Sequence, residues 1–172
     1  GLFFGKRCRY LTTATEGSAI RKLWVASSAL TRFTLMLLMH RVSLLHVHGA
    51  SHGSFWRKRV FMQLAGVFSV PVIFHLHGGE FRQFVDQRLD GAARRKVIDS
   101  LLACSLIYCL NNEVAAWLRG VAPGVPGHVL PNPINLPATE ETSESRETSI
   151  LFLGRLEQEK GVFDLVNALA TI

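Results

Sequence analysis

Short apolar runs alternate with amphipathic segments along the first 130 residues of the chain. Nearly continuous apolar runs are typical of strands buried on both faces, whereas apolar residues recurring every three or four positions indicate helices. The expected strands are 9–13, 43–49, 70–78, 105–110 and 127–130, and the expected helices are 17–41, 54–68, 92–103 and 111–118. Ser18 and Asn111 are suitable N-caps for the first and last of these helices. Strands separated by helices predict an α/β fold with a parallel sheet.

A change in composition divides the chain. Residues 131–149 are rich in Pro, Glu, Ser and Thr, which is typical of an exposed linker. A second unit is then predicted, with a strand at 149–154 and an amphipathic helix from Gly161 or Val162. One strand and one helix cannot bury a core, so we expect this second domain to be cut off, or to be completed by something outside this sequence. The predicted domains are 1–136, a linker at 137–148, and the start of a second domain at 149–172.

Charge is distributed unevenly along the 172 residues, which carry a net charge of +6. Residues 1–60 contain ten Lys and Arg but only one acid, whereas residues 136–172 contain three Lys and Arg against seven acids. A basic half favours an anionic neighbour, such as a phosphate-bearing ligand or a membrane surface, although solvated helix faces explain it equally well. Nucleic acid is the weakest of these alternatives, because no recognisable binding module accompanies the charge.

Cysteine usage and hydropathy bear on location. Three cysteines, an odd number without metal-ligand spacing, favour a reducing cytoplasm over a disulfide framework. Residues 23–39 are apolar but are interrupted by Arg32, and a spanning helix needs about 20 predominantly apolar residues. We therefore expect a cytoplasmic protein with a buried or membrane-leaning amphipathic helix at 23–39.

Two pairs of histidines lie at the carboxyl ends of predicted strands: His46 and His48, and His75 and His77. In parallel α/β sheets, ligands bind beyond these ends. Side chains alternate along a strand, so His75 and His77 face the same side, with His77 nearest the cleft. We expect His77 to contact a ligand and His75 to be a buried structural neighbour. For His46 and His48, both a functional and a structural role remain open.

The segment after His77 is Gly78-Gly79-Glu80. Glycines allow a tight turn and a close approach of backbone N–H groups to a sugar or phosphate oxygen. Glu80 can bind a sugar hydroxyl, and a surface role is an equally good alternative.

The stretch "LFLGRLEQEKG" places two cations beside a predicted helix N-terminus. Gly154 allows close backbone approach, and Arg155 with Lys160 can bind a di-anion such as a diphosphate. The alternative is a solvated turn in which Lys160 pairs with Glu157 or Glu159.

Four segments resemble family 4 (group 1) glycosyltransferases. "ILFLGRLEQEKGVFDLVNAL" is similar to the opening of their donor domain, and "VLPNPINLP" is similar to their inter-domain segment. "VIFHLHGGEF" resembles a strand and loop that end in His-Gly, and "HVHGASHGSFWRK" resembles the acceptor-side segment of bacterial polysaccharide enzymes. The resemblance covers most of residues 17–172.

The resemblance implies two Rossmann-like domains facing a cleft, and transfer of a sugar from a nucleotide-sugar with retention of configuration. Arg155, Lys160 and Gly154 then bind the donor diphosphate, and His77 lies near the transferred sugar. The acceptor or sugar side comprises Gly78, Gly79, Glu80, Ser51, Ser54, Arg57 and Lys58. The nucleotide-sugar is a co-substrate, no cofactor or metal is expected, and the acceptor is a glycan or a lipid-linked glycan at the inner face of the membrane. Bacterial polysaccharide or lipopolysaccharide synthesis is the implied setting.

Two elements of the family are absent from the chain, namely the glycine-rich loop after the first strand and the later E-x7-E motif. The chain is therefore expected to be truncated at both ends. One alternative function is a non-catalytic remnant. Another is a metal-dependent hydrolase that uses the two H-x-H pairs, with Glu80 and Asp86 as the nearest acids to the strand ends.

Overall fold

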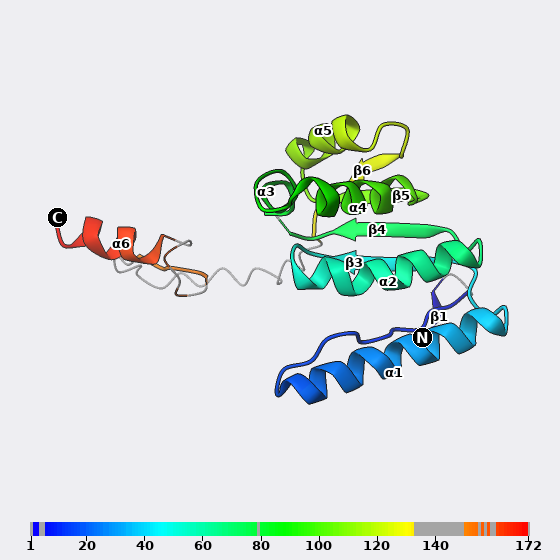
Figure 1. The fold of residues 1–172 in the computed structure, drawn as a ribbon. Helices are drawn as coiled ribbons and strands as arrows, with labels where there is room; N and C mark the ends of the chain where they lie inside the picture. Colours follow the sequence, from blue (N-terminus) through cyan, green and yellow to red (C-terminus); the bar gives the residue numbers. More distant parts are fainter. Residues whose placement is uncertain are drawn as a thin grey trace. The chain divides into compact units, whose positions relative to one another are not determined.

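The computed structural model forms two compact units, Gly1–Pro133 and Ile134–Ile172 (Figure 1). It describes residues 2–3, 6–78, 80–132, 150–154, 156, 158 and 161–171. The elements of the first unit are β1 (Leu2–Phe3), β2 (Lys6–Arg7), α1 (Ala19–Leu38), β3 (Leu45–Gly49), α2 (Gly53–Val67), β4 (Val72–Leu76), α3 (Phe81–Gln87), α4 (Gly91–Leu102), β5 (Leu106–Cys109), α5 (Asn112–Val121) and β6 (Gly127–Val129). The second unit contains α6 (Val162–Leu169).

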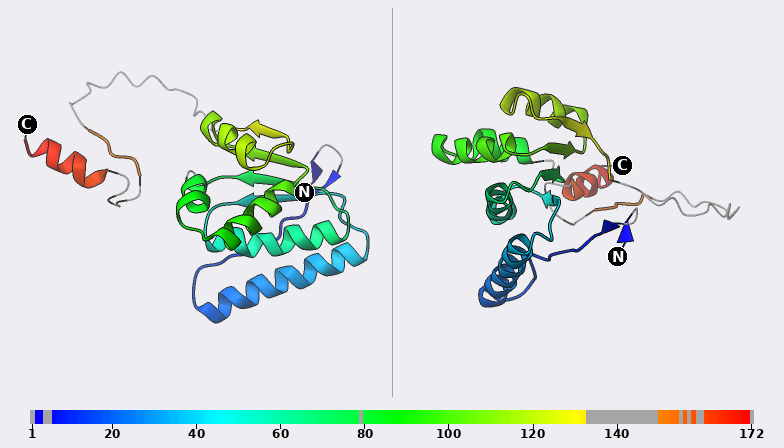
Figure 2. Two further views of the ribbon diagram at one scale, coloured as in Figure 1. Left: turned by 45° about the horizontal axis from the view of Figure 1, so that its top comes forward. Right: turned by 90° about the vertical axis from the view of Figure 1, so that its right-hand side faces the viewer.

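The strands β3, β4, β5 and β6 lie side by side in chain order and are all parallel. This confirms the predicted α/β fold and the parallel, Rossmann-like arrangement of the sheet. Crossovers between parallel strands are right-handed, so strands in sequential order place their connecting helices on one face. Figure 2 (right) shows α1, α2, α4 and α5 on one side of the strands. We call the opposite side of the sheet the open face.

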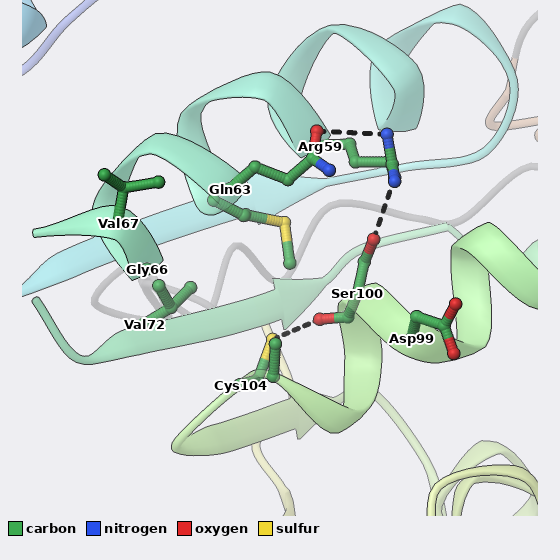
Figure 3. Close-up of a pocket in the computed structure, with 10 residues that line it drawn as sticks. Arg59, Gln63, Gly66, Val67, Val72, Asp99, Ser100 and Cys104 are labelled. Carbon is green, nitrogen blue, oxygen red and sulfur yellow. Dashed lines mark hydrogen bonds between the residues drawn. The ribbon is translucent and has the colours of Figure 1, made fainter. Parts of the chain in front are cut away.

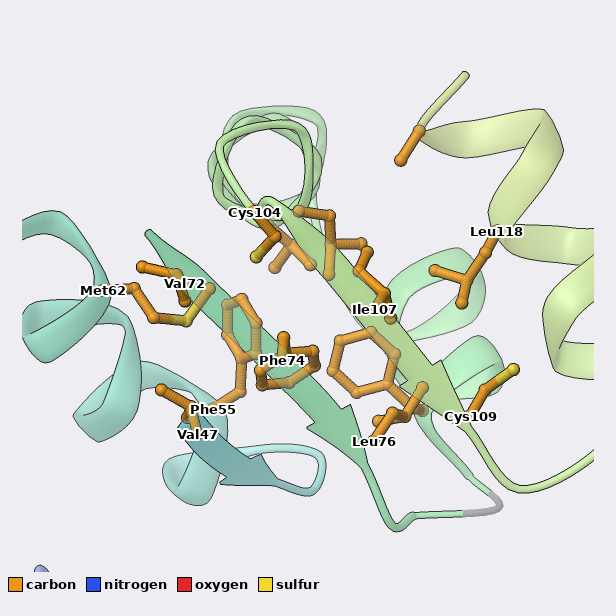
Figure 4. Packing of buried hydrophobic residues seen from close by; sticks show 14 of the residues in the cluster. Val47, Phe55, Met62, Val72, Phe74, Leu76, Cys104, Ile107, Cys109 and Leu118 are labelled. Carbon is orange, nitrogen blue, oxygen red and sulfur yellow. The ribbon is translucent and has the colours of Figure 1, made fainter. Parts of the chain in front are cut away.

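The hydrophobic core lies between the sheet and these helices (Figure 4). Alternate residues of β4 point into it, and Phe74 and Leu76 are fully buried. Phe55 of α2 meets Phe74 edge-on with ring centroids 6.0 Å apart, and Ile107 of β5 lies on the same side of the sheet. Complete burial of such a side chain stabilises the fold by about 1.5–3 kcal/mol.

The first helix starts where the sequence predicts. The Ser18 side chain accepts a hydrogen bond from the Arg21 backbone N–H, as an N-cap should. The helix buries Ala29, Phe33 and Leu37, which lie four residues apart and so share one face. No helix in the described part of the chain is long and apolar enough to cross a bilayer.

The predicted helices and strands of the first unit are confirmed only in part. Residues 9–13 form no strand, and α3 was not predicted because its seven residues carry only two turns of apolar pattern. The Asn111 side chain caps α5 through the Val114 N–H, as predicted.

The second unit, taken by itself, contains the predicted helix as α6, with no buried residue. The predicted strand at 149–154 is wrong where the structure describes it, because residues 150–154 are not in a strand. A strand needs a neighbour for its backbone hydrogen bonds, and the described residues of this unit supply none. The predicted linker at 137–148 lies outside the described residues.

Candidate functional site

The open face carries a row of polar aromatic side chains towards the carboxyl ends of its strands. The sheet register aligns His48, His75, Tyr108 and His128 across the four strands. Because side chains alternate along strands, all four project from the face opposite to Phe74 and Leu76. His46 and His48 are exposed, whereas His75 is only 6% exposed.

Three of the histidines form a tight cluster. One ring nitrogen from each of His46, His48 and His75 lies within 4.8 Å of the other two. Ring centroids of His46 and His48 are 4.4 Å apart, and those of His48 and His75 are 5.2 Å apart. Imidazole nitrogens at such distances can share a transition-metal ion, which needs neutral rings.

The electrostatics favour these neutral rings. Burial lowers the pKa of His75 to about 4, and the neighbouring His77, His48 and His46 add to this effect, while the Leu130 backbone opposes it. Burial also lowers the pKa of His46 and of His48, again with contributions from nearby cationic groups. An uncharged ring costs less to desolvate than an imidazolium, so the cluster is neutral near pH 7.

His77 stands at the end of β4 and is held by two side chains. Its Nε2 lies 2.7 Å from His48 Nδ1, and its Nδ1 lies 3.1 Å from Asn132 Oδ1. The His77 backbone N–H also donates to the Gly49 carbonyl at 2.9 Å, which continues the β3–β4 pairing by one residue. His77 is half-buried, so His75 is the deeper of the two, as the sequence predicted.

Two glycines near the strand ends have different structural reasons. A Cβ at Gly49 would lie 2.3 Å from the Phe74 ring, so this glycine is required by the core. A Cβ at Gly78 would make only ordinary contacts with Ala50 and Ser51, at 3.5–3.6 Å. Gly78 also lacks a positive φ, so neither packing nor backbone conformation requires glycine here, and the approach of its N–H to a ligand stays a prediction. Gly79 lies outside the described residues.

The start of α2 contributes the remaining predicted acceptor-side residues. Lys58 Nζ donates a hydrogen bond to Ser54 Oγ at 3.3 Å. Burial, followed by the nearby Arg57 charge, lowers the pKa of Lys58. Arg57 Nε is buried and has no hydrogen-bond partner among the described residues. Ser51 is half-buried in the turn before the helix.

The two acids near the strand ends are not directed at the histidines. Glu80 is exposed and precedes α3 without a capping hydrogen bond. Asp86 accepts from Trp117 Nε1 at 2.9 Å and from Arg94 at 3.4 Å, so it belongs to a network between helices. No carboxylate of the described residues joins the histidine cluster.

The predicted diphosphate site is only partly described. Gly154 is exposed in the second unit, and Arg155 and Lys160 lie outside the described residues. The structure therefore adds no contact for these two cations.

A cavity of about 350 Å³ lies between α2 and α4 at the amino end of β4 (Figure 3). Arg59 reaches across it, donating to Gln63 and to Ser100 at 3.0 Å each. Burial raises the pKa of Cys104, another lining residue, to about 12, so its thiol is not a nucleophile at neutral pH. The cavity lies at the amino edge of the sheet, away from the histidines, and the Arg59 side chain is already hydrogen-bonded. Because parallel sheets bind ligands at the carboxyl edge, this cavity is a weaker candidate site than the histidine cluster.

Asn132 is the site residue that sequence reasoning missed. It lies in the "VLPNPINLP" segment just after β6 and reaches His77, 55 positions earlier in the chain. The only signal in the sequence was its place directly beyond a strand end, where parallel sheets collect functional side chains.

No family model, no curated protein and no solved structure matches the chain. Its chemistry is therefore argued from the carboxyl edge of the sheet. There the arrangement offers neutral imidazoles, an exposed amide and a partly desolvated ammonium, a set suited to binding hydroxyl groups and anions.

Proposed function

We propose that the chain is part of a retaining glycosyltransferase that transfers a sugar from a nucleotide-sugar to a glycan or lipid-linked acceptor. One observation carries the proposal: three segments that resemble such enzymes meet at the carboxyl edge of the sheet. The backbone N–H of His77 in "HLHGGE" donates to the Gly49 carbonyl of "HVHGAS", and the His77 ring hydrogen-bonds Asn132 of "LPNP". Parallel sheets bind ligands at this edge, so the meeting of the three segments there supports a site.

Sugar transfer from a nucleotide-sugar requires fixed positive charges beside the departing diphosphate. Breaking the bond between the anomeric carbon and the diphosphate builds negative charge on the leaving group, and preorganised cations stabilise it. Arg155 and Lys160 supply these cations in the proposal, on the strength of their motif, and a second Rossmann-like domain carries them.

His77 supplies the sugar-side contact. Both of its ring nitrogens are hydrogen-bonded, to His48 and to Asn132, so its orientation is fixed before substrate arrives. Asn132 is exposed, whereas His48 lies in the cluster, so a sugar hydroxyl displaces Asn132 more easily. His77 Nδ1 then donates to the hydroxyl near the reacting carbon.

The acceptor is proposed to reach the enzyme at an anionic membrane surface on the cytoplasmic side. Helix α1 buries one face against the core, while Ile20, Leu23 and Trp24 on another face are exposed. Arg21 and Lys22 lie among them. An exposed apolar stripe flanked by cations suits the boundary between lipid headgroups and acyl chains.

The metal-dependent hydrolase is the second candidate, favoured by the His46, His48 and His75 cluster. Such enzymes pair the metal with a carboxylate that acts as a base, and the described residues place none in the cluster. The histidines thus support metal binding more than hydrolysis.

The first test is the reading frame beyond Ile172. The proposal expects an open frame that encodes an E-x7-E motif in the second domain. A stop codon close after Ile172 would support the non-catalytic remnant instead.

The second test uses the full-length protein and a panel of nucleotide-sugars. Arg155→Ala and Lys160→Ala should each lower turnover by about 100- to 1,000-fold, the loss typical of one charge-stabilising donor. Arg146→Ala, in the predicted linker, is the matched loss of one cation and should leave turnover unchanged. Wild-type turnover in both site variants would refute the diphosphate assignment.

A further inference from the structure

We propose that His46, His48 and His75 form a binding site for a zinc ion on the open face of the sheet. The site joins two neighbouring strands, because β3 supplies His46 and His48 and β4 supplies His75. It is distinct from the proposed diphosphate site, and it does not depend on the proposed transferase activity.

The ligand spacing is close to what zinc needs. Zinc binds imidazole nitrogen at about 2.0–2.1 Å, so two ligands of a tetrahedral site are about 3.3 Å apart. The three ring nitrogens already lie within 4.8 Å of one another, and small rotations of the rings close the difference. Three neutral histidines with one open position are an established zinc donor set, whereas magnesium and calcium prefer oxygen.

A hydrogen-bond relay presents His48 as a ligand. Asn132 Oδ1 is an acceptor, so His77 Nδ1 carries the proton between them, and His77 Nε2 is left with a lone pair. That lone pair accepts the proton of His48 Nδ1 across 2.7 Å. The lone pair of His48 is consequently on Nε2, free for a metal, with the orienting partner that metal-bound histidines usually have.

His75 gives an independent reason to expect an ion. Both of its ring nitrogens are buried, and neither makes a well-formed hydrogen bond within the described residues, although the Leu130 backbone lies near enough to act on the ring. An unpaired polar atom in a buried position is destabilising, and coordination satisfies it.

One neighbour opposes the ion. Lys58 of α2 lies close enough to His48 to lower its pKa, so its ammonium also repels a dication. The site should therefore bind zinc more tightly when this charge is removed. Binding would also fix His48, and through it the orientation of His77.

The experiment uses the full chain, stripped of metal with a chelator, and titrates it with zinc in a calorimeter. The expected result is one zinc per chain, a raised melting temperature, and no comparable effect of magnesium. Cobalt should bind in place of zinc and give the visible spectrum of a tetrahedral site. Less than half an equivalent of bound zinc would overturn the proposal.

Matched variants locate the ion. His46→Ala removes an exposed ligand and should weaken zinc binding by about 100-fold or more. His128→Ala removes an exposed histidine on the same face, separated from the cluster by Tyr108, and should leave the affinity within about threefold. Equal affinities for His46→Ala and wild type, or equal losses in both variants, would refute the site.

Two more variants test the relay and the opposing charge. His77→Ala removes the partner of His48 and should weaken zinc binding by about 10- to 100-fold, as loss of an outer hydrogen bond does. Lys58→Met should tighten zinc binding. Unchanged zinc affinity in His77→Ala would contradict the relay.

The zinc proposal and the glycosyltransferase proposal can fail separately. The zinc titrations do not measure sugar transfer, so their result stands whether or not the full-length protein shows transferase activity.

Discussion

The two faces of strand β4 differ in chemistry although they alternate residue by residue. Phe74 and Leu76 point into the helix-covered core and are buried. Ile73 and His75 point to the open face, where the row through His75 continues as His48 on β3, Tyr108 on β5 and His128 on β6. One set of positions stabilises the sheet, and the other gathers polar rings at its carboxyl edge. Substitutions on the two faces should therefore affect different measurements.

The largest stability effect is expected at Phe74. Phe74→Ala deletes a fully buried ring from the centre of the core and should lower the free energy of unfolding by about 3–5 kcal/mol. His46→Ala, at an exposed position on the open face, should change it by less than about 1 kcal/mol. Urea unfolding of metal-free protein measures both. Similar losses would mean that the open face stabilises the fold as much as the core face does.

Anionic vesicles test the exposed stripe of α1, whose Trp24 is 70% exposed. The double change of Arg21 and Lys22 to Gln should weaken vesicle binding by about 2 kcal/mol, because each basic residue near such a surface contributes about 1 kcal/mol. High salt should weaken wild-type binding similarly, since it screens the charges. Sedimentation with anionic and neutral vesicles is the measurement, and equal binding to both would contradict the proposal.

Gly49 links the two faces, because it follows His48 while its missing Cβ faces the Phe74 ring. Gly49→Ala should destabilise the protein by about 1–3 kcal/mol through overpacking. Adding Phe74→Leu should recover part of that loss, since the clashing ring atoms are then gone. Gly66→Ala in α2 has open space around its Cβ and should stabilise instead. A Gly49→Ala variant as stable as wild type would show that the ring can move aside.

The smallest effect concerns His52, which precedes α2 with a φ of 56°. A non-glycine residue in this conformation is strained by about 1–3 kcal/mol. His52→Gly should therefore raise the free energy of unfolding by about 1 kcal/mol, seen as a higher midpoint of urea unfolding. A lower midpoint would indicate that the His52 ring, 4.8 Å from that of Phe84, contributes more by packing than it costs in strain.

Local patterns in the sequence were sufficient for most of the first unit. Apolar runs predicted the four parallel strands that form, together with a strand at 9–13 that does not, and the Ser18 and Asn111 caps predicted where two helices begin. The strand at 149–154 was wrong because its apolar residues have no neighbouring strand in the described residues. Apolar pattern shows that a segment can pair, but the partner decides whether it does.

The candidate site was predicted less completely for the same reason. Alternation along β4 predicted that His75 and His77 share a side, and their ring centroids lie 4.0 Å apart. The contact between His77 and Asn132 joins residues whose proximity depends on the whole sheet. No local pattern encodes such a contact.

The most direct test of the central claim compares His77→Ala with His75→Ala in the full-length protein. His77 is half-buried at the strand end, and we expect its loss to lower donor turnover by at least about 100-fold with an unchanged melting temperature of the metal-free protein. His75 lies deeper, and its loss should mainly lower the melting temperature. Turnover with a nucleotide-sugar and thermal unfolding, measured on both variants, decide the matter. If His75→Ala abolishes turnover while His77→Ala only destabilises the protein, the assignment of the site to the end of β4 is wrong.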